Sequence, residues 1–349
     1  MYNLITLSNE EMKKHVMDPQ HPEKPLRLDK FIQGFNLFKD KNNYKCKYVK
    51  SEKILEEDLL LVHNLNLINI IKSISLQGGG VITWDNVLNK HTFSSACYAA
   101  GASKQAAELV SNNETEKAFA IVRPPGHHTN SSTVAGFCFF NNIAIAAETL
   151  ISKGFSKIAI VDIDQHFGNG TADIFYSRND VLYYSIHAHP AYAYPGRGYP
   201  FESGIYDGTG YTVNCPVLPK INTQNWIYTF QQSIKILEQF KPEVVLVSVG
   251  FDGLETDPVG MLNLKIEAFQ AAGFILSQIA DKYSKGRIIA VTEGGYDLNS
   301  LSFCTNSFLS GIMGTKPKIL TYQDNWKIFK TTRYQLAIFK KHLSSFWDL

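Results

Sequence analysis

Three potential metal ligands stand at alternate positions in the segment VDIDQHFGNGT, residues 161–171. Asp162, Asp164 and His166 follow the apolar run 158–161, which predicts a buried strand. Residues i, i+2 and i+4 of an extended chain point to one face, so the three side chains converge if this geometry persists. Two carboxylates and an imidazole are costly to bury without a cation, and this donor set suits zinc, iron or manganese.

The same segment has two other interpretations. Asp-x-Asp pairs often cap loops, and the Gly-Asn-Gly at 168–170 is a common turn. A strand followed by this turn is also part of a dinucleotide-binding fingerprint, but Asp173 occupies the third glycine position. Asp164 and His166 would obstruct a pyrophosphate there, so we reject the dinucleotide site. A metal site and a loop cap remain open for this segment by itself.

Regular alternation of apolar runs and helical patterns begins at residue 118 and predicts βαβ units. The predicted strands are 118–122, 158–163, 181–186, 244–249 and 288–291. The predicted helices are 142–153, 224–240 and 265–283. Earlier in the chain, helical spacing covers 28–38, 59–74 and 95–110, with a glycine-rich loop at 78–80. No repeat or linker interrupts the pattern, so we predict one α/β domain with a parallel sheet and helices on both faces.

Polar or glycine-rich segments follow all five predicted strands. They are 123–128 (RPPGHH), 162–166, 185–187, 250–258 and 293–296 (EGGY). Ligand sites of open α/β sheets lie beyond the carboxyl ends of the strands, so these segments meet at one edge. Each has an ordinary explanation by itself: a histidine pair is often superficial, Asp252 could cap a helix, and Tyr296 could belong to the core. Their joint arrival at one edge favours a functional site.

The side chains at this edge suffice for metal-assisted amide hydrolysis. Asp164, His166 and Asp252 supply three ligands and leave positions on a zinc ion for water and substrate. The metal lowers the pKa of that water and polarises a carbonyl group. A general base must lie within hydrogen-bonding reach of the water, and His127 and His128 are the available imidazoles.

Three further side chains complete this chemistry. Asp162 or Asn169 could accept a hydrogen bond from the distal nitrogen of each histidine and so fix its tautomer. Tyr296 supplies a hydroxyl donor for the developing oxyanion, and its neighbours Gly294 and Gly295 let the chain approach closely.

Six segments of the chain, in order, resemble the motifs of the zinc-dependent histone deacetylase and acetylpolyamine amidohydrolase family. They are RPPGHH, GFCFFNN, VDIDQHFGNGT, SIHAHPAYAYPGRG, SVGFDGLETDPVG and EGGYDL. The resemblance spans residues 20–315. It implies the arginase/deacetylase fold, a single α/β domain around a mostly parallel eight-stranded sheet, with 316–349 as a helical extension that packs on the domain.

The resemblance also implies roles for individual residues. Asp164, His166 and Asp252 become the ligands of one zinc ion, for which iron(II) can substitute. His128 becomes the general base beside His127, and Tyr296 the oxyanion donor. The implied substrate-binding residues are Phe137, Tyr194, Asp85, Gly136, Gly294, Gly295 and Arg27, the last lining an acetate exit channel. A structural K⁺ is implied near Asp162, Asp164, His166 and Ser185.

The sequence departs from the family pattern at three of these positions. Phe167 stands where a second histidine is frequent, which leaves the ligand His166 intact. Tyr194 stands where the second tunnel wall is usually phenylalanine. Asn169 replaces an aspartate, as in the class II-like branch, so His128 would be oriented by a neutral amide. His127, by contrast, would pair with a carboxylate, which raises its pKa.

The leading functional hypothesis is a zinc deacetylase that hydrolyses the acetamide of N-acetylated primary amines. Acetyl-lysine of proteins is the favoured substrate, supported by the loop 194–198 (YPGRG). Acetylpolyamines are the alternative, supported by the His-Pro-Glu segment 21–23. The intact ligands, histidines and tyrosine disfavour a non-catalytic acyl-lysine binding module, and an arginase-like ureohydrolase would need more bridging carboxylates.

Composition narrows the other possibilities. A net charge of +2 over 349 residues carries no signature of extensive nucleic-acid binding. The five cysteines are scattered and never form a C-x-x-C pair, which favours reduced thiols. The N-terminus lacks a signal-peptide layout, and no apolar run is long enough for a membrane span. We therefore predict a cytoplasmic enzyme, unless a signal-less route exports it, and make no prediction of its oligomeric state.

Overall fold

The structure, a computed structural model, describes residues 1–349. Its centre is an eight-stranded sheet in the order β2-β1-β5-β10-β9-β6-β7-β8. The strands are β1 (Leu4–Ser8), β2 (Cys46–Lys50), β5 (Lys117–Ala120), β6 (Ile158–Asp162), β7 (Val181–Ala188), β8 (Thr212–Val217), β9 (Val244–Val249) and β10 (Ile288–Thr292). Every pairing between neighbours is parallel, so all carboxyl ends lie at one edge.

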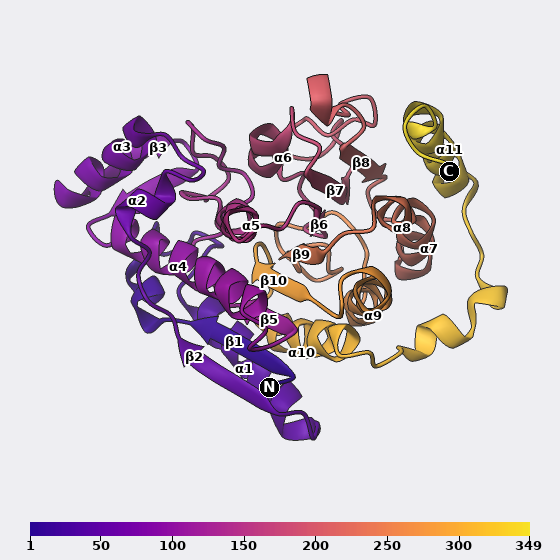
Figure 1. Ribbon diagram of the computed structural model, residues 1–349, viewed down its shortest axis with the longest axis horizontal. Coiled ribbons are helices and arrows are strands. Elements are labelled where there is room, and N and C mark those ends of the chain that lie inside the picture. The colour runs from indigo at the N-terminus through magenta and orange to yellow at the C-terminus, as the bar shows by residue number, and fades with distance from the viewer.

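Two layers of helices cover the sheet (Figure 1). One face carries α4 (Thr92–Ser111), α5 (Asn142–Ser152) and α6 (Asn169–Phe175). The opposite face carries α1 (Leu26–Lys41), α7 (Thr223–Ser233), α8 (Ile236–Phe240), α9 (Ile266–Tyr283) and α10 (Leu301–Ile312). This cover explains the continuous apolar composition of the central strands, in which every residue of β6, β9 and β10 is buried.

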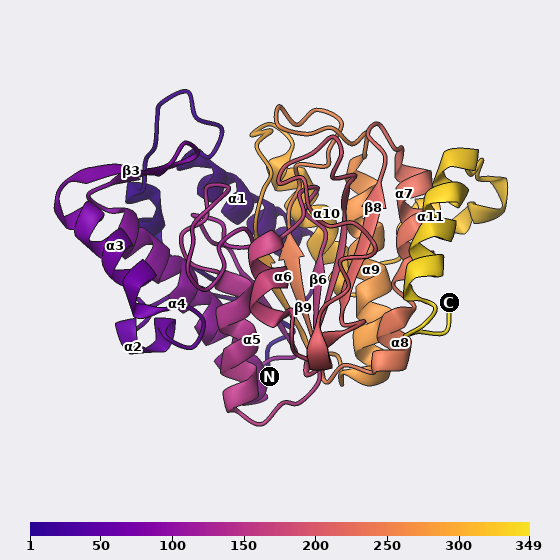
Figure 2. The same ribbon diagram turned by 90° about the horizontal axis from the view of Figure 1, so that it is seen from above.

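Smaller elements lie at the two opposite ends of the molecule, as the view from above makes clear (Figure 2). At one end are α2 (Glu56–Leu59), α3 (Leu65–Leu76) and the antiparallel hairpin β3 (Gly79–Thr83) and β4 (Asn86–Asn89). At the other end, α11 (Lys330–Leu343) packs against α7 and β8. Short 3₁₀ helices cover Glu10–Lys14, Tyr206–Gly208, Lys318–Thr321 and Gln323–Asn325.

The predicted α/β domain with a parallel eight-stranded sheet is confirmed, and the sheet is parallel throughout. Three strands of this sheet were not predicted, namely β1, β2 and β8. β2 is an edge strand of half-exposed and exposed residues, so it has no apolar run to detect. β8 contains Asn214 and Pro216, and Pro216 is tolerated because β8 is also at an edge.

Several helix boundaries also differ from prediction. The predicted helix 224–240 is two helices, α7 and α8, and the predicted helix 59–74 is broken before Asn64, whose side chain caps α3 by accepting from Leu67 N. The predicted glycine-rich loop at 78–80 is the start of the β3–β4 hairpin. None of the helices is both long and apolar enough to cross a membrane. All five cysteines are free.

Candidate active site

The three predicted metal ligands follow two neighbouring strands, β6 and β9, which pair in parallel. His166 Nδ1 lies 3.1 Å from Asp164 Oδ1 and 2.9 Å from Asp252 Oδ2. One donor atom of each residue lies within 4.8 Å of the others. The structure therefore brings Asp164, His166 and Asp252 together as the spacing of the sequence predicts.

The electrostatics of this cluster fit a bound cation. Burial, reinforced by the charge of Asp164, raises the pKa of Asp252 to about 7. Burial lowers the pKa of His166, but the carboxylates of Asp252 and Asp164 outweigh that effect and raise the pKa to about 10. Two buried carboxylates repel each other unless a positive charge lies between them. Two carboxylates and one imidazole suit a divalent ion such as zinc or iron(II).

The paired histidines lie beside this cluster, in the loop after β5. His127 Nδ1 is 3.0 Å from Asp162 Oδ2, and His128 Nδ1 is 2.8 Å from Asn169 Oδ1. The centroids of the two imidazole rings are 4.0 Å apart. The two partners that the sequence suggested, one carboxylate and one amide, are thus in hydrogen-bonding contact with separate rings.

The surroundings of the two histidines shift their pKa values in opposite directions. Burial lowers the pKa of His127, but the carboxylates of Asp162 and Asp164 outweigh it and raise the pKa to about 10. Burial and the charges of His127 and His166 hold the pKa of His128 well below its ordinary value, against the hydrogen bond to Asn169. The raised pKa of His127 matches the prediction. For His128 the neutral amide predicted orientation without a pKa shift, and this was wrong, because burial and the neighbouring imidazoles lower its pKa.

A buried carboxylate that the sequence did not assign, Glu293, holds the histidine loop against β10. Its Oε2 accepts from Gly126 N at 2.7 Å and from His127 N at 3.1 Å. Burial raises the pKa of Glu293 to about 7. An acidic residue directly after an apolar strand was visible in the sequence, but nothing there indicated that it faces two backbone N–H groups of another loop.

Tyr296 lines the same space, and Arg27 lies behind it. The Arg27 guanidinium carbon is 4.6 Å from the centroid of the Tyr296 ring. Arg27 also donates to Gly295 O at 2.7 Å and to Glu293 O at 2.5 Å, and it pairs with Glu23 at 2.9 Å. Arg27 is fully buried and does not line the cavity itself. Its contacts indicate that it supports the 293–296 loop.

One cavity of about 150 Å³ connects these side chains to solvent. It is lined by Trp84, Asp85, Pro125, His127, His128, Gly136, Phe137, Asp164, His166, Tyr194, Val259, Gly294 and Tyr296. Five of the seven predicted substrate-binding residues are in this lining, whereas Gly295 and Arg27 are not. Trp84, Pro125 and Val259 also line the cavity but were not assigned. Pro125 and Val259 lie within two of the family-like motifs, but their apolar side chains have no chemistry that marks them as cavity residues.

The walls of the cavity are aromatic and tightly fixed. Phe137 lies edge-on to Tyr296 with centroids 6.1 Å apart, and Tyr194 lies edge-on to His128 at 5.0 Å. Phe137 has a φ of +68°, a costly conformation for a bulky residue. The preceding backbone is held by Asp85, whose Oδ2 accepts from Gly136 N at 2.9 Å.

Two glycines are required here by close approach. A Cβ on Gly136 would lie 2.2 Å from His128 Cδ2, and a Cβ on Gly294 would lie 2.4 Å from Asp252 Oδ2. The second gap allows Gly294 N to donate to Asp164 Oδ2 at 2.8 Å. The absence of a side chain therefore keeps both His128 and the predicted metal ligands in place.

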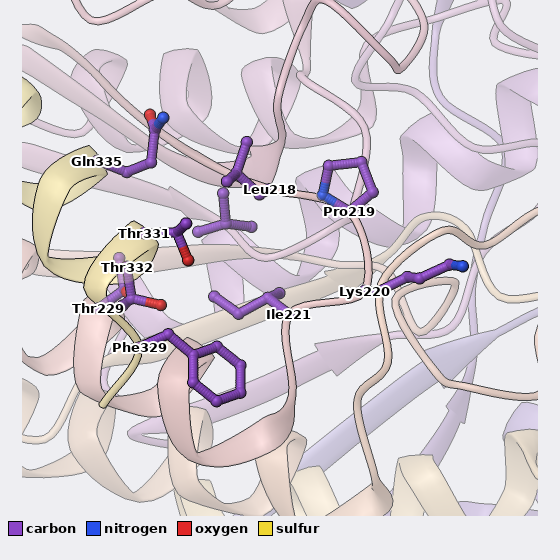
Figure 3. A pocket seen from close by; sticks show the side chains of 10 residues that line it. Leu218, Pro219, Lys220, Ile221, Thr229, Phe329, Thr331, Thr332 and Gln335 are labelled. Carbon is purple, nitrogen blue, oxygen red and sulfur yellow. The ribbon is translucent and has the colours of Figure 1, made fainter. Parts of the chain in front are cut away.

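A second cavity, of about 130 Å³, lies between the end of β8 and the start of α11 (Figure 3). It is lined by apolar residues, threonines, Lys220 and Gln335, and it contains none of the predicted site residues. In Figure 3 the Lys220 ammonium points away from the threonines.

Comparison with known proteins agrees with this geometry. Residues 21–312 match the histone deacetylase domain family. A probable deacetylase of Archaeoglobus fulgidus is 36% identical over 299 residues, which cover 85% of this chain and 82% of that protein. Acetylpolyamine amidohydrolase 2 of Pseudomonas aeruginosa is 35% identical over 203 residues, 58% of each chain.

A solved structure gives the same result for the fold. The crystal structure of the HDA15 HD domain superposes with a TM-score of 0.89 at 28% identity, over 99% of this chain and 96% of that one. The chain therefore belongs to the family of histone deacetylases and acetylpolyamine amidohydrolases, and it is an amidohydrolase of the deacetylase type.

Proposed function

We propose that the chain is a zinc-dependent deacetylase whose main substrates are acetyl-lysine side chains of proteins. The observation that carries the zinc assignment is the contact of His166 Nδ1 with two buried carboxylates, Asp164 and Asp252. When bound there, zinc would lower the pKa of a water molecule and polarise the acetamide carbonyl. The five free cysteines support a reducing, cytoplasmic setting.

Residues of the protein carry out proton transfer, stabilise the developing charge and hold the substrate. His128, held neutral, takes the proton of the attacking water and passes it to the leaving amine. His127, held as an imidazolium by Asp162, stabilises negative charge beside it. The Tyr296 hydroxyl, which makes no hydrogen bond within the protein, donates to the developing oxyanion. Phe137 and Tyr194 flank the alkyl chain of the substrate.

We also infer a structural K⁺ site near Asp162, Asp164, His166 and Ser185. His187 Nε2 contacts the carbonyl oxygen of Gly198 at 2.9 Å and must therefore carry a hydrogen. Burial lowers the pKa of His187 to about 4, so its Nδ1 is unprotonated and accepts from Ser185 Oγ at 2.8 Å. The lone pairs of Ser185 stay free beside Asp162, its partner in the sheet register, and suit a cation.

The histidine roles lead to a prediction for kinetics. His128→Ala is expected to lower kcat/KM more than His127→Ala, because only His128 is neutral and able to accept a proton. Asn169→Asp adds a carboxylate that favours the imidazolium form and raises the pKa of His128. Since the base must be neutral, the acid limb of kcat/KM then moves to higher pH. pH profiles with zinc content confirmed measure this. The assignment would be rejected if both alanine variants lost kcat/KM equally and the acid limb of Asn169→Asp stayed at its wild-type pH.

The choice of acetyl-lysine over acetylpolyamine rests on the mouth of the cavity. Trp84 is 84% exposed there and offers an apolar surface to residues that flank an acetylated lysine. Acetylated putrescine carries no such flanking residues. The acetylpolyamine alternative is supported by the relative of that name.

A comparison of two substrates tests this choice. Trp84→Ala is expected to raise KM for acetyl-lysine peptides several-fold and to leave KM for acetylputrescine unchanged. Tyr206→Ala is the matched control, since Tyr206 is 83% exposed but does not line the cavity. If wild-type kcat/KM is higher for acetylputrescine than for every peptide tried, the acetylpolyamine function replaces the one proposed.

A further inference from the structure

A single carboxylate joins two loops of the active site. Asp257 lies in the loop between β9 and α9 and is only 7% exposed. Its Oδ2 accepts from Tyr296 N at 2.6 Å and from Asp297 N at 3.1 Å. Its Oδ1 accepts from Val259 N at 3.0 Å. The carboxylate thus uses both oxygens to satisfy three backbone N–H groups.

The groups that Asp257 holds are parts of the cavity wall. Val259 lines the cavity, and its carbonyl oxygen accepts from the Gln165 side chain at 3.0 Å, next to the ligand His166. Tyr296 lines the same cavity. Asp257 therefore fixes the tyrosine loop relative to the loop that carries the ligands.

Tyr296 depends on this support because its hydroxyl has no partner within the protein. Arg27 packs on the face of its ring, which restricts the side chain from behind. The backbone of the residue is held by Asp257. An aspartate suits the task, because an ionised carboxylate only accepts, whereas an asparagine would turn its NH₂ group toward one of the N–H donors. Burying such a carboxylate costs free energy, which these three hydrogen bonds offset.

We propose that Asp257 is a positioning residue for catalysis, which fixes the Tyr296 backbone so that its hydroxyl meets the developing oxyanion. This inference rests on the proposed deacetylase function. Asp257 touches neither substrate nor metal ligands in this role, and it acts through Tyr296.

The test is a double-mutant cycle with Asp257→Ala and Tyr296→Phe. Asp257→Ala is expected to lower kcat by ~10–100-fold, the usual range for an outer-shell partner, with KM and zinc content nearly unchanged. In the Tyr296→Phe background, where no hydroxyl remains to be positioned, the same change is expected to lower kcat less than threefold. Asp257→Asn should recover part of the loss, since its amide oxygen can still accept from Tyr296 N.

The control is Glu243→Ala. Glu243 Oε2 likewise accepts from two backbone N–H groups, Ser156 N at 2.7 Å and Lys157 N at 3.1 Å, but at the amino ends of the strands. Its kcat should match wild type. If Asp257→Ala does not fold, Asp257→Asn is compared in both backgrounds, with a smaller expected loss of kcat in the presence of Tyr296 and none in the Tyr296→Phe background.

Three results would overturn the inference: an unchanged kcat, an equal loss in both backgrounds, or a rise in KM alone. A rise in KM alone would mean that Asp257 acts by holding Val259 in the cavity wall instead. A wild-type protein without turnover on any acetylated amine would refute the proposed function and this inference with it. Wild-type turnover together with one of the three results refutes the inference alone.

Discussion

Asp252→Ala is expected to lose bound zinc and deacetylase turnover together. The variant removes one of three ligands from a site that must also keep positions open for water and substrate. The charge stabilisation lost with the metal is worth several kcal/mol, so kcat/KM should fall by at least ~10³-fold. Asp164→Ala and His166→Ala should behave alike, because each supplies one donor atom to the same cluster.

Metal analysis and thermal unfolding measure this result. Zinc should raise the Tm of the metal-free wild type, since a ligand that binds only the folded state stabilises it, and should leave the Tm of Asp252→Ala unchanged. Asp180→Ala is a control, because Asp180 pairs with Arg178 at the opposite edge of the sheet. A ligand variant that retains a full equivalent of zinc and normal turnover would disprove the ligand set.

Tyr296→Phe is expected to lower kcat by ~10²–10³-fold, the usual effect of losing one oxyanion donor. KM and zinc content should change little, because the hydroxyl acts on charge that develops in the transition state. The fold should persist, since Oη makes no hydrogen bond within the protein.

The control for this variant is Tyr184→Phe. It removes a buried hydroxyl that contacts Ser233 Oγ at 2.6 Å, so it should cost stability of ~1 kcal/mol but leave kcat unchanged. Steady-state kinetics on an acetyl-lysine peptide, with unfolding curves for both variants, make the comparison. A wild-type kcat for Tyr296→Phe would remove Tyr296 from the mechanism.

Some residues of the site could be predicted from the sequence, and others could not. Asp164, His166 and Asp252 were predictable because strand periodicity and the shared carboxyl edge of a parallel sheet bring them together. Asp257 and Glu293 were not assigned roles, because each acts by accepting from backbone N–H groups of a distant loop. Hydrogen bonds of this kind depend on loop conformation and leave no periodic pattern. The same reason hid Trp84, whose importance depends on where a hairpin places it.

Fold prediction failed where burial is one-sided or local chemistry interrupts a pattern. The strands β5, β6, β7, β9 and β10 were found because helices cover both of their faces, which makes them largely apolar. β1 is buried as well, but it was missed because Thr6 and Ser8 interrupt its five-residue apolar pattern. The edge strands β2 and β8 were missed because exposure or a proline broke that signal. Asn64 ended a helical pattern by capping the next helix, a signal that apolar periodicity alone does not include.

The position of β10 between β5 and β9 has a consequence for synthesis of the chain. β2, β1 and β5 form one part of the sheet, β9, β6, β7 and β8 form the other, and only β10 pairs with both. Lys117 meets Ile288 in this register, so the joining contact has a long sequence separation and a high contact order. A nascent chain that lacks residues 288–292 cannot pair the two parts into one continuous sheet. The ribosome must therefore release most of the polypeptide before the sheet closes and Tyr296 can reach the predicted metal ligands.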